Sequence, residues 1–138
     1  MRVTTKGRYG LRAILELASY DGEKPVSIKA IAEKENLSPE FLEQIFFRLR
    51  KAGLITSTRG PGGGFKMNIP ASKLTIAQIF DAVGEDISLA PCTRPVQDVR
   101  CKMEPDCIMK NVWEDSTDYI RSHFDSITID SILRKYTT

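Results

Sequence analysis

The chain has 138 residues, of which 28% are charged and 41% are apolar, with a formal net charge of +2. This length is sufficient for one domain with a modest core, or for a small domain with an extension. No apolar run approaches the roughly 20 residues that a membrane span needs, and the first residues, MRVTTKGRYG, lack the apolar stretch of a signal peptide. We therefore expect a cytoplasmic protein without a membrane partner.

The charge is divided unevenly along the chain. Residues 1–68 contain twelve Lys and Arg and seven Asp and Glu, a net charge of +5. Residues 69–138 contain eight Lys and Arg and eleven Asp and Glu, a net charge of −3. A basic half joined to an acidic half fits a nucleic-acid-binding part followed by a controlling part, although chance also produces a division of this size.

Three helices are predicted before residue 53. Residues 9–22 have apolar side chains at helical spacing, with Gly22 as a stop. Residues 26–37 begin with Ser27 as an N-cap, and residues 37–53 begin with Ser38 as an N-cap and Pro39 at the first helical position. The short link ENLSPE joins the second and third helices. This arrangement predicts a helix-turn-helix that ends at Gly53.

A β-hairpin is predicted directly after this helix-turn-helix. The β-type runs LITSTR and FKMNI flank the turn GPGGG. A helix-turn-helix followed at once by a hairpin is the plan of a winged-helix domain. A further helix, KLTIAQIFDAVG, follows with Thr75 as its cap.

The second half of the chain begins with an irregular segment. Residues 85–107 contain three prolines and all three cysteines, and residues 108–127 and 128–136 then predict a long and a short helix. The winged-helix part of one chain would leave the long helix uncovered, so we expect a helix from a second subunit to bury it. The predicted fold class is mainly α with a small β-hairpin. It comprises a winged helix-turn-helix head at 1–84, a cysteine-rich loop at 85–110, and a dimerisation helix with a tail at 111–138.

The second helix of a helix-turn-helix enters the DNA major groove with its N-terminal residues at base edges. Gln44 can read adenine, and Glu43 can accept from cytosine N4. Arg59, beside the glycine-rich wing tip, can enter a narrow minor groove, while an ordinary hairpin turn is the alternative explanation of the glycines. The predicted DNA-contacting residues are Ser38, Glu43, Gln44, Arg50, Arg59, Gly60, Gly62 and Gly63, and further candidate phosphate contacts are Arg2, Lys6, Arg8, Arg48 and Lys51.

The three cysteines, Cys92, Cys101 and Cys107, have the spacing C-x8-C-x5-C. Three thiolates in a polar loop favour a soft metal or a cluster, and the CxxC pairs of structural zinc sites do not occur. Iron–sulfur clusters accept irregular spacing and need a fourth ligand, while three unrelated thiols are the alternative. The single histidine, His123, is more simply a partly exposed helix residue, and no nucleophile is predicted beside it, so we expect no enzyme.

The segments MRVTTKGRYGLRAILELA and FLEQIFFRLRKAGLITSTRGPGGGF, with the three-cysteine loop, resemble the IscR-type winged-helix regulators of the Rrf-two family over nearly the whole chain. The resemblance implies a homodimeric transcription regulator that binds pseudo-palindromic promoter DNA. It implies that Cys92, Cys101 and Cys107 bind an iron–sulfur cluster, typically 2Fe–2S. In the IscR branch, cluster occupancy changes which promoters are bound, and the regulated genes include those for cluster assembly. The resemblance also implies a specificity-tuning carboxylate at Glu43, a base-reading amide at Gln44 and a minor-groove arginine at Arg59.

Two departures from the family pattern concern the fourth ligand. IscR has a histidine three residues after its last cysteine, where this chain has Lys110, and its first cysteine spacing is shorter. The open candidates are Glu43, Asp98, Glu104, Asp106 and a solvent molecule. The nitric-oxide branch uses an N-terminal aspartate where this chain has Arg8. The alternatives are a cluster-free repressor of cysteine or sulfur metabolism, regulated by thiols or a partner, and a nitric oxide-sensing repressor.

Overall fold

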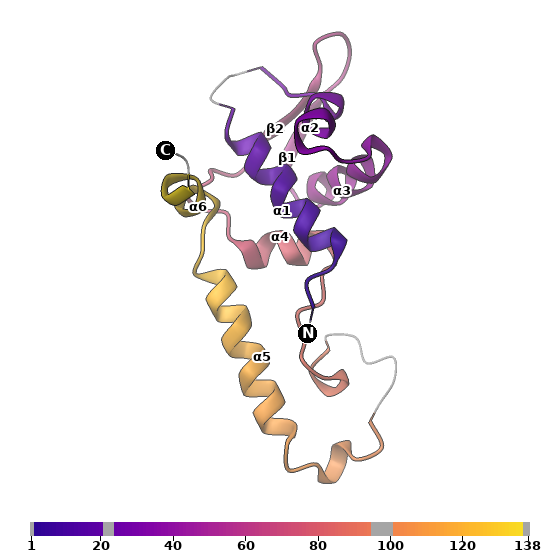
Figure 1. The fold of residues 1–138 in the computed structure, drawn as a ribbon, viewed down its shortest axis with the longest axis vertical. Helices are drawn as coiled ribbons and strands as arrows, with labels where there is room; N and C mark the ends of the chain where they lie inside the picture. The colour runs from indigo at the N-terminus through magenta and orange to yellow at the C-terminus, as the bar shows by residue number, and fades with distance from the viewer. Residues whose placement is uncertain (1, 21–23, 95–100, 137–138) are drawn as a thin grey trace.

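The computed structural model describes residues 2–20, 24–94 and 101–136 (Figure 1). The elements are α1 (Thr5–Ala18), α2 (Ile28–Glu35), α3 (Pro39–Lys51), β1 (Ile55–Thr58), β2 (Gly64–Met67), α4 (Ile76–Val83), the 3-10 turns η1 (Pro91–Thr93) and η2 (Glu104–Asp106), α5 (Lys110–Asp125) and α6 (Ile129–Tyr136). Helices α1 to α4 and the hairpin form a head, and α5 extends away from it along the long axis (Figure 1). The predicted mainly helical fold with a small hairpin is confirmed.

Local capping signals set the starts of α2, α3 and α4. Ser27 Oγ accepts a hydrogen bond from a first-turn N–H of α2 at 3.1 Å, and Ser38 does the same for α3 at 3.4 Å. Thr75 caps α4 through a capping box. Asn36, in the left-handed region at φ 53°, ends α2. The caps at Ser27, Ser38 and Thr75 lie where the sequence predicts them, whereas the end of α2 at Asn36 is a finding of the structure. Asn36 and Ser38 bound the turn of the helix-turn-helix.

The limits of α1 differ from the prediction. The helix begins at Thr5, four residues before the apolar pattern, and it ends at Ala18. Gly22, the expected stop, lies outside the described residues. A helix long and apolar enough to span a lipid bilayer does not occur within the described ranges.

The core of the head joins α1, α2, α3 and the hairpin. Ile14, Ile31 and Phe46 are fully buried in it. Phe46 of α3 also packs on Phe65 of β2, with ring centroids 4.8 Å apart. Because this contact fixes the hairpin against α3, the helix and the wing are held as one unit.

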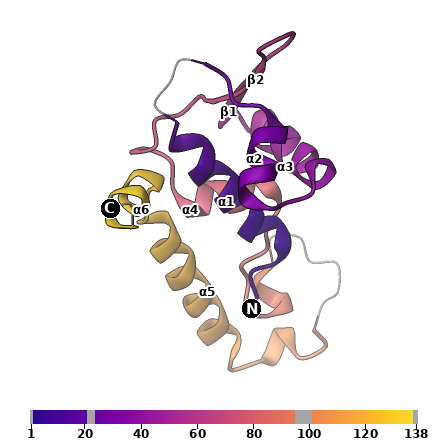
Figure 2. The ribbon, with the colours of Figure 1, turned by 45° about the horizontal axis from the view of Figure 1, so that its top comes forward.

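The wing is a two-stranded antiparallel hairpin with an added bridge to the segment before α2. Thr58 pairs with Gly64 at its tip, and Val26 exchanges backbone hydrogen bonds with Phe65 at 2.8 and 2.9 Å. Gly64 has a φ of +155°, and a Cβ there would lie 2.4 Å from the Val26 carbonyl oxygen. This position therefore requires glycine for the packing of the wing itself. The hairpin projects from the end of the head away from α5 (Figure 2).

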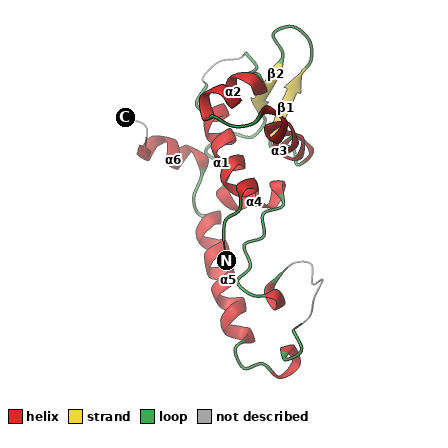
Figure 3. Ribbon diagram, turned by 45° about the vertical axis from the view of Figure 1, so that its right-hand side comes forward, coloured by secondary structure: helices red, strands yellow, loops and turns green. Residues whose placement is uncertain are grey.

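The C-terminal end of α5 is tied to the head. Phe124 packs edge-to-face on Phe80 of α4, with centroids 5.3 Å apart, and the Ile129 N–H donates to the Leu74 carbonyl at 2.8 Å. Figure 3 shows the rest of α5 running below the head, with the residues that directly follow α4 beside it. Of all α5 residues, only Thr117 is buried.

Candidate functional site

The sequence divides α3 into an inner and an outer face. Leu42, Ile45, Phe46 and Leu49 are buried in the core, so the side chains on the opposite side of the helix turn outward. Five of these outward side chains define what we call the outer face of α3: Glu40, Glu43, Gln44, Phe47 and Lys51. These five line an open groove of about 1000 Å³ that extends to Asp81 and Gly84 at the end of α4.

Ser38 and Glu40 form a polar start to α3. Besides capping the helix, Ser38 Oγ donates to Glu40 Oε2 at 2.8 Å. The pKa of Glu40 is lowered because its own backbone N–H and the Ser38 hydroxyl both donate to the carboxylate. The predicted DNA contact at Ser38 is therefore already engaged in capping, which leaves Glu43 and Gln44 as the exposed polar side chains one turn further on.

The two arginines of α3 have partners inside the protein. Arg48 Nη1 donates to the Val83 carbonyl oxygen at 3.0 Å and so ties α3 to the end of α4. Arg50 Nη1 donates to Ser57 Oγ of β1 at 3.3 Å, and its guanidinium lies 6.0 Å from the centroid of Phe47. Arg48 therefore positions α3, while Arg50 bridges the outer face to the wing.

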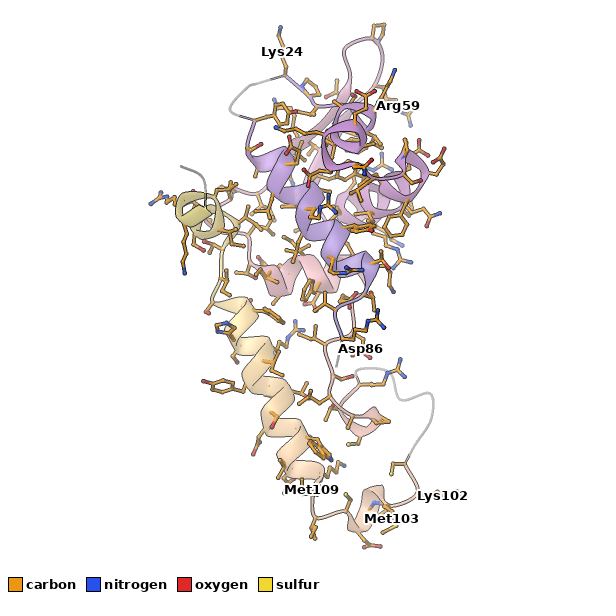
Figure 4. The ribbon with its side chains drawn as sticks, viewed as in Figure 1. Lys24, Arg59, Asp86, Lys102, Met103 and Met109 are labelled. Atoms are coloured by element: carbon orange, nitrogen blue, oxygen red, sulfur yellow. The ribbon has the colours of Figure 1, made fainter. Side chains whose placement is uncertain are left out.

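The tip of the wing carries an exposed arginine beside bare backbone. Arg59 is exposed near the end of the molecule opposite to Met103 (Figure 4). Gly60 and Gly62 have positive φ values, and a Cβ at either would meet nothing within 4 Å. A Cβ at Gly63 would lie 2.2 Å from the Thr58 carbonyl oxygen. Gly60 and Gly62 thus leave the tip open to an approaching surface, whereas Gly63 has a reason to be glycine within the hairpin.

Residues 81–85, which we call the α4 junction, connect three parts of the molecule. The carboxylate of Glu85 accepts from the Thr4 N–H at 2.7 Å, from the Gly7 N–H at 3.1 Å and from the Thr4 hydroxyl. Glu85 is only 6% exposed, and its carboxylate serves the unpaired N–H groups at the start of α1. Sequence reasoning missed it because its partners lie 78 to 81 residues away.

The same junction holds α5 by an ion pair. Arg121 donates to both oxygens of Asp81, with Nη1 to Oδ1 at 3.0 Å. The pKa of Arg121 is raised because of these hydrogen bonds to the Asp81 carboxylate. Together with the Arg48 bond to Val83, this places contacts to α1, α3 and α5 within five consecutive residues, just before the cysteine-containing segment.

The three cysteines lie between the α4 junction and α5. Cys92 is half-buried in η1, Cys101 is exposed, and Cys107 is half-buried just before α5. None forms a disulfide. Cys92 borders a cavity of about 260 Å³, whose other lining residues are Thr93, Arg94, Glu114, Thr117 and Asp118.

The three cysteines fit an iron–sulfur cluster in the chemistry of their ligand atoms, because their thiols are soft ligands. The structure does not bring these ligands together: within the described residues, no three His, Cys, Asp or Glu side chains lie close enough to hold a metal ion. Asp98 lies outside the described residues, and the side chain of Glu104 is likewise not described. Glu43 lines the groove of α3 rather than the cavity beside Cys92.

Two carboxylates that the sequence analysis did not consider face this cavity. Glu114 and Asp118, one helical turn apart on α5, line it with Cys92. Their i, i+4 spacing inside the predicted long helix could have shown that they share a face. His123 is exposed further along α5 and does not line the cavity.

The N-terminal part of α5 leaves apolar side chains in solvent. Tyr119 is 79% exposed and Ile108, just before the helix, is 92% exposed. Four exposed apolar residues follow one another at intervals of three, one and six residues, which places them on one side of the helix. They are Met109, Val112, Trp113 and Tyr119. A stripe of this kind is typical of a helix that packs against a partner.

Comparisons with known proteins agree with this arrangement. The model of the Rrf2 family, described as an iron-dependent transcriptional regulator, matches residues 3–135. The chain is 35% identical over 133 residues to the HTH-type transcriptional regulator IscR of Pectobacterium atrosepticum, covering 96% of this chain and 79% of that protein. Two solved structures, T. potens IscR and the global cysteine regulator CymR of B. subtilis, each show a TM-score of 0.76 at 33% identity. The first likeness covers 98% of this chain and 88% of the other, and the second covers 100% and 99%. This chain is therefore a member of the Rrf2 family of transcriptional regulators, DNA-binding proteins rather than enzymes.

Proposed function

We propose that this protein is a homodimeric, sequence-specific repressor of iron–sulfur cluster assembly genes, and that a bound cluster, of the 2Fe–2S type, controls its DNA binding. The observation that carries the proposal is the placement of the thiols. All three cysteines of the chain lie in the one segment that leaves the α4 junction and enters α5. Cys92, Cys101 and Cys107 would hold the cluster, which when bound would supply a redox-sensitive cross-link between three points of this segment.

In this proposal α3 and the wing read the DNA. Glu43 and Gln44 are exposed on the outer face of α3, where their carboxylate and amide can meet base edges in the major groove. Arg59, beside the open backbone of Gly60 and Gly62, enters the minor groove. Arg50 holds α3 and β1 together through Ser57, so the two reading elements approach DNA as a unit.

A second copy of the chain would cover the exposed stripe of α5. A two-fold pair of α5 helices buries the stripe of each copy against that of the other. Val112, Trp113 and Tyr119 would lie in the contact. The two heads then meet half-sites about one helical turn apart, on a pseudo-palindrome.

The α4 junction provides the route from the thiols to the DNA-reading elements. Any change in the position of the segment after residue 85 acts on the carboxylate that holds the start of α1 and on the carbonyl of Val83 that holds Arg48 of α3. The linkage is reciprocal, so DNA that selects one arrangement of α3 also selects one arrangement of the thiol segment.

The fourth ligand completes the proposed site. The chain has Lys110 where a histidine would stand three residues after Cys107. Glu114 and Asp118 line the cavity beside Cys92 and join Asp98, Glu104, Asp106 and solvent as candidate oxygen donors, whereas Glu43 lies on the outer face of α3. Thiolates are the ligands that iron–sulfur clusters prefer, so a single oxygen ligand in the fourth place would suit a cluster that is readily gained and lost.

The test is the cluster content of protein purified without oxygen. We expect a coloured protein with about two iron atoms and two sulfides per protomer, and loss of both in Cys92→Ala. Glu114→Gln and Asp118→Asn, compared with exposed Asp115→Asn as a matched control, show whether either carboxylate stabilises the cluster. A colourless wild-type protein without iron, purified from iron-replete cells, would overturn the proposal.

The likeness to the global cysteine regulator CymR supports a second candidate function. In that case the thiols, or a partner protein, regulate DNA binding without a cluster. This candidate predicts a colourless protein whose DNA affinity changes with thiol oxidation or with the partner present, and the same purification distinguishes the two.

A further inference from the structure

An exposed aromatic ring lies on the outer face of α3. Phe47 is 57% exposed, whereas its neighbour Phe46 is fully buried. Phe47 follows Glu43 by four residues and Gln44 by three, so the three side chains share one side of the helix. The ring also has a fixed neighbour: the guanidinium of Arg50 lies 6.0 Å from its centroid.

Arg50 is itself anchored, since its Nη1 donates to Ser57 Oγ on β1 at 3.3 Å. The cation therefore covers one side of the Phe47 ring from the direction of the wing. The ring remains exposed between the polar side chains of the outer face. A benzyl group cannot donate to phosphate, and it cannot pair with the polar atoms of a base edge. An apolar group on the DNA is the partner that its chemistry fits.

We propose that Phe47 determines sequence specificity by packing against the 5-methyl group of thymine in the major groove. This methyl group is the apolar feature that distinguishes one base pair there. The inference rests on the proposed reading of DNA by α3, and it assigns to that surface an apolar contact beside the polar contacts of Glu43 and Gln44. The exposed stripe of α5, which the second copy covers, is on a different element, so Phe47 is not needed for dimerisation.

The test combines one change in the protein with one change in the DNA. A site is first selected from random duplexes with wild-type, full-length protein, and each thymine is then replaced by deoxyuridine, which lacks only the methyl group. At one position in each half-site we expect deoxyuridine to weaken wild-type binding about fourfold, as for one lost methyl contact. Phe47→Ala should bind the thymine and deoxyuridine duplexes equally. Phe47→Leu, which keeps an apolar side chain, should retain part of the difference.

The controls separate this inference from the proposed function. Because Phe47 is exposed, Phe47→Ala should keep the thermal unfolding temperature of the wild type. If Gln44→Ala alters base preference while every deoxyuridine effect persists in Phe47→Ala, the thymine contact is refuted and the reading role of α3 stands. If Gln44→Ala and Phe47→Ala both leave base preference unchanged, α3 does not read the DNA, and both ideas fail.

Discussion

The carboxylate of Glu85 should contribute more to stability than an ordinary surface acid. Glu85→Ala removes the acceptor for the Thr4 and Gly7 N–H groups and for the Thr4 hydroxyl. A hydrogen bond to a charged group contributes about 1.5–3 kcal/mol, and a carboxylate at a helix N-terminus adds about 0.3–1 kcal/mol. The three bonds share one side chain and do not add fully. We therefore expect Glu85→Ala to lower the free energy of unfolding by about 3–4 kcal/mol.

Glu85→Gln should cost less, about 2 kcal/mol, because the amide keeps one acceptor oxygen but loses the charge. The assay is urea denaturation at one fixed protein concentration, since a dimer's stability depends on concentration. Exposed Glu33 on α2 gives a matched control, Glu33→Gln, which should stay within about 0.5 kcal/mol of the wild type. If Glu85→Ala is as stable as the control, the carboxylate does not hold α1, and the proposed route through the α4 junction loses its first step.

Three further predictions follow from the packing. Gly64→Ala should unfold the wing and abolish DNA binding, because its Cβ would meet backbone at 2.4 Å, whereas Gly62→Ala, with open space, should cost only about 1 kcal/mol of strain; equal behaviour of the two variants would contradict this. Tyr119→Glu should convert the dimer to monomer in sedimentation analysis, and a variant that remains dimeric would place the contact elsewhere. Lys34 pairs with Glu16 at 2.9 Å, and its pKa is raised because the ammonium donates to that carboxylate. The pair should therefore stabilise the fold below the ordinary lysine pKa of about 10.4 and lose its effect as the pH rises through the higher folded value. Denaturation of wild type and Lys34→Met should give a difference in stability at pH 7 that shrinks as the pH is raised beyond the ordinary lysine pKa; a difference that grows with pH would contradict the pairing.

The helices of the head could be predicted because their signals are local. Ser27, Ser38 and Thr75 each cap the helix that begins at the next residue, and the caps act within one turn. The hairpin could be predicted equally well, from two β-type runs on either side of a glycine-rich turn. The outward placement of Glu43 and Gln44 follows from the 3.6-residue period of the buried side chains of α3.

The contacts between elements could not be predicted in this way. Glu85 and Arg48 bond to groups far away in the sequence, and no local pattern marks them. Arg48 is a clear case: its position on a basic stretch predicts a phosphate contact, yet its guanidinium donates to the Val83 carbonyl. Gly63 shows the same limit, because the close Thr58 carbonyl that excludes a side chain arises only when the hairpin has formed.

The control of DNA binding by a cluster is the central claim, and affinity measured with and without the cluster tests it most directly. One preparation, purified without oxygen, is divided, and the cluster is removed from one half by a chelator. Both halves are then titrated against several selected DNA sites at one salt concentration, since salt alone changes such affinities. We expect the two forms to differ by about 5- to 150-fold on at least one class of site, and Cys92→Ala to behave like the chelated protein. Equal affinity of the two forms for every site would contradict the account.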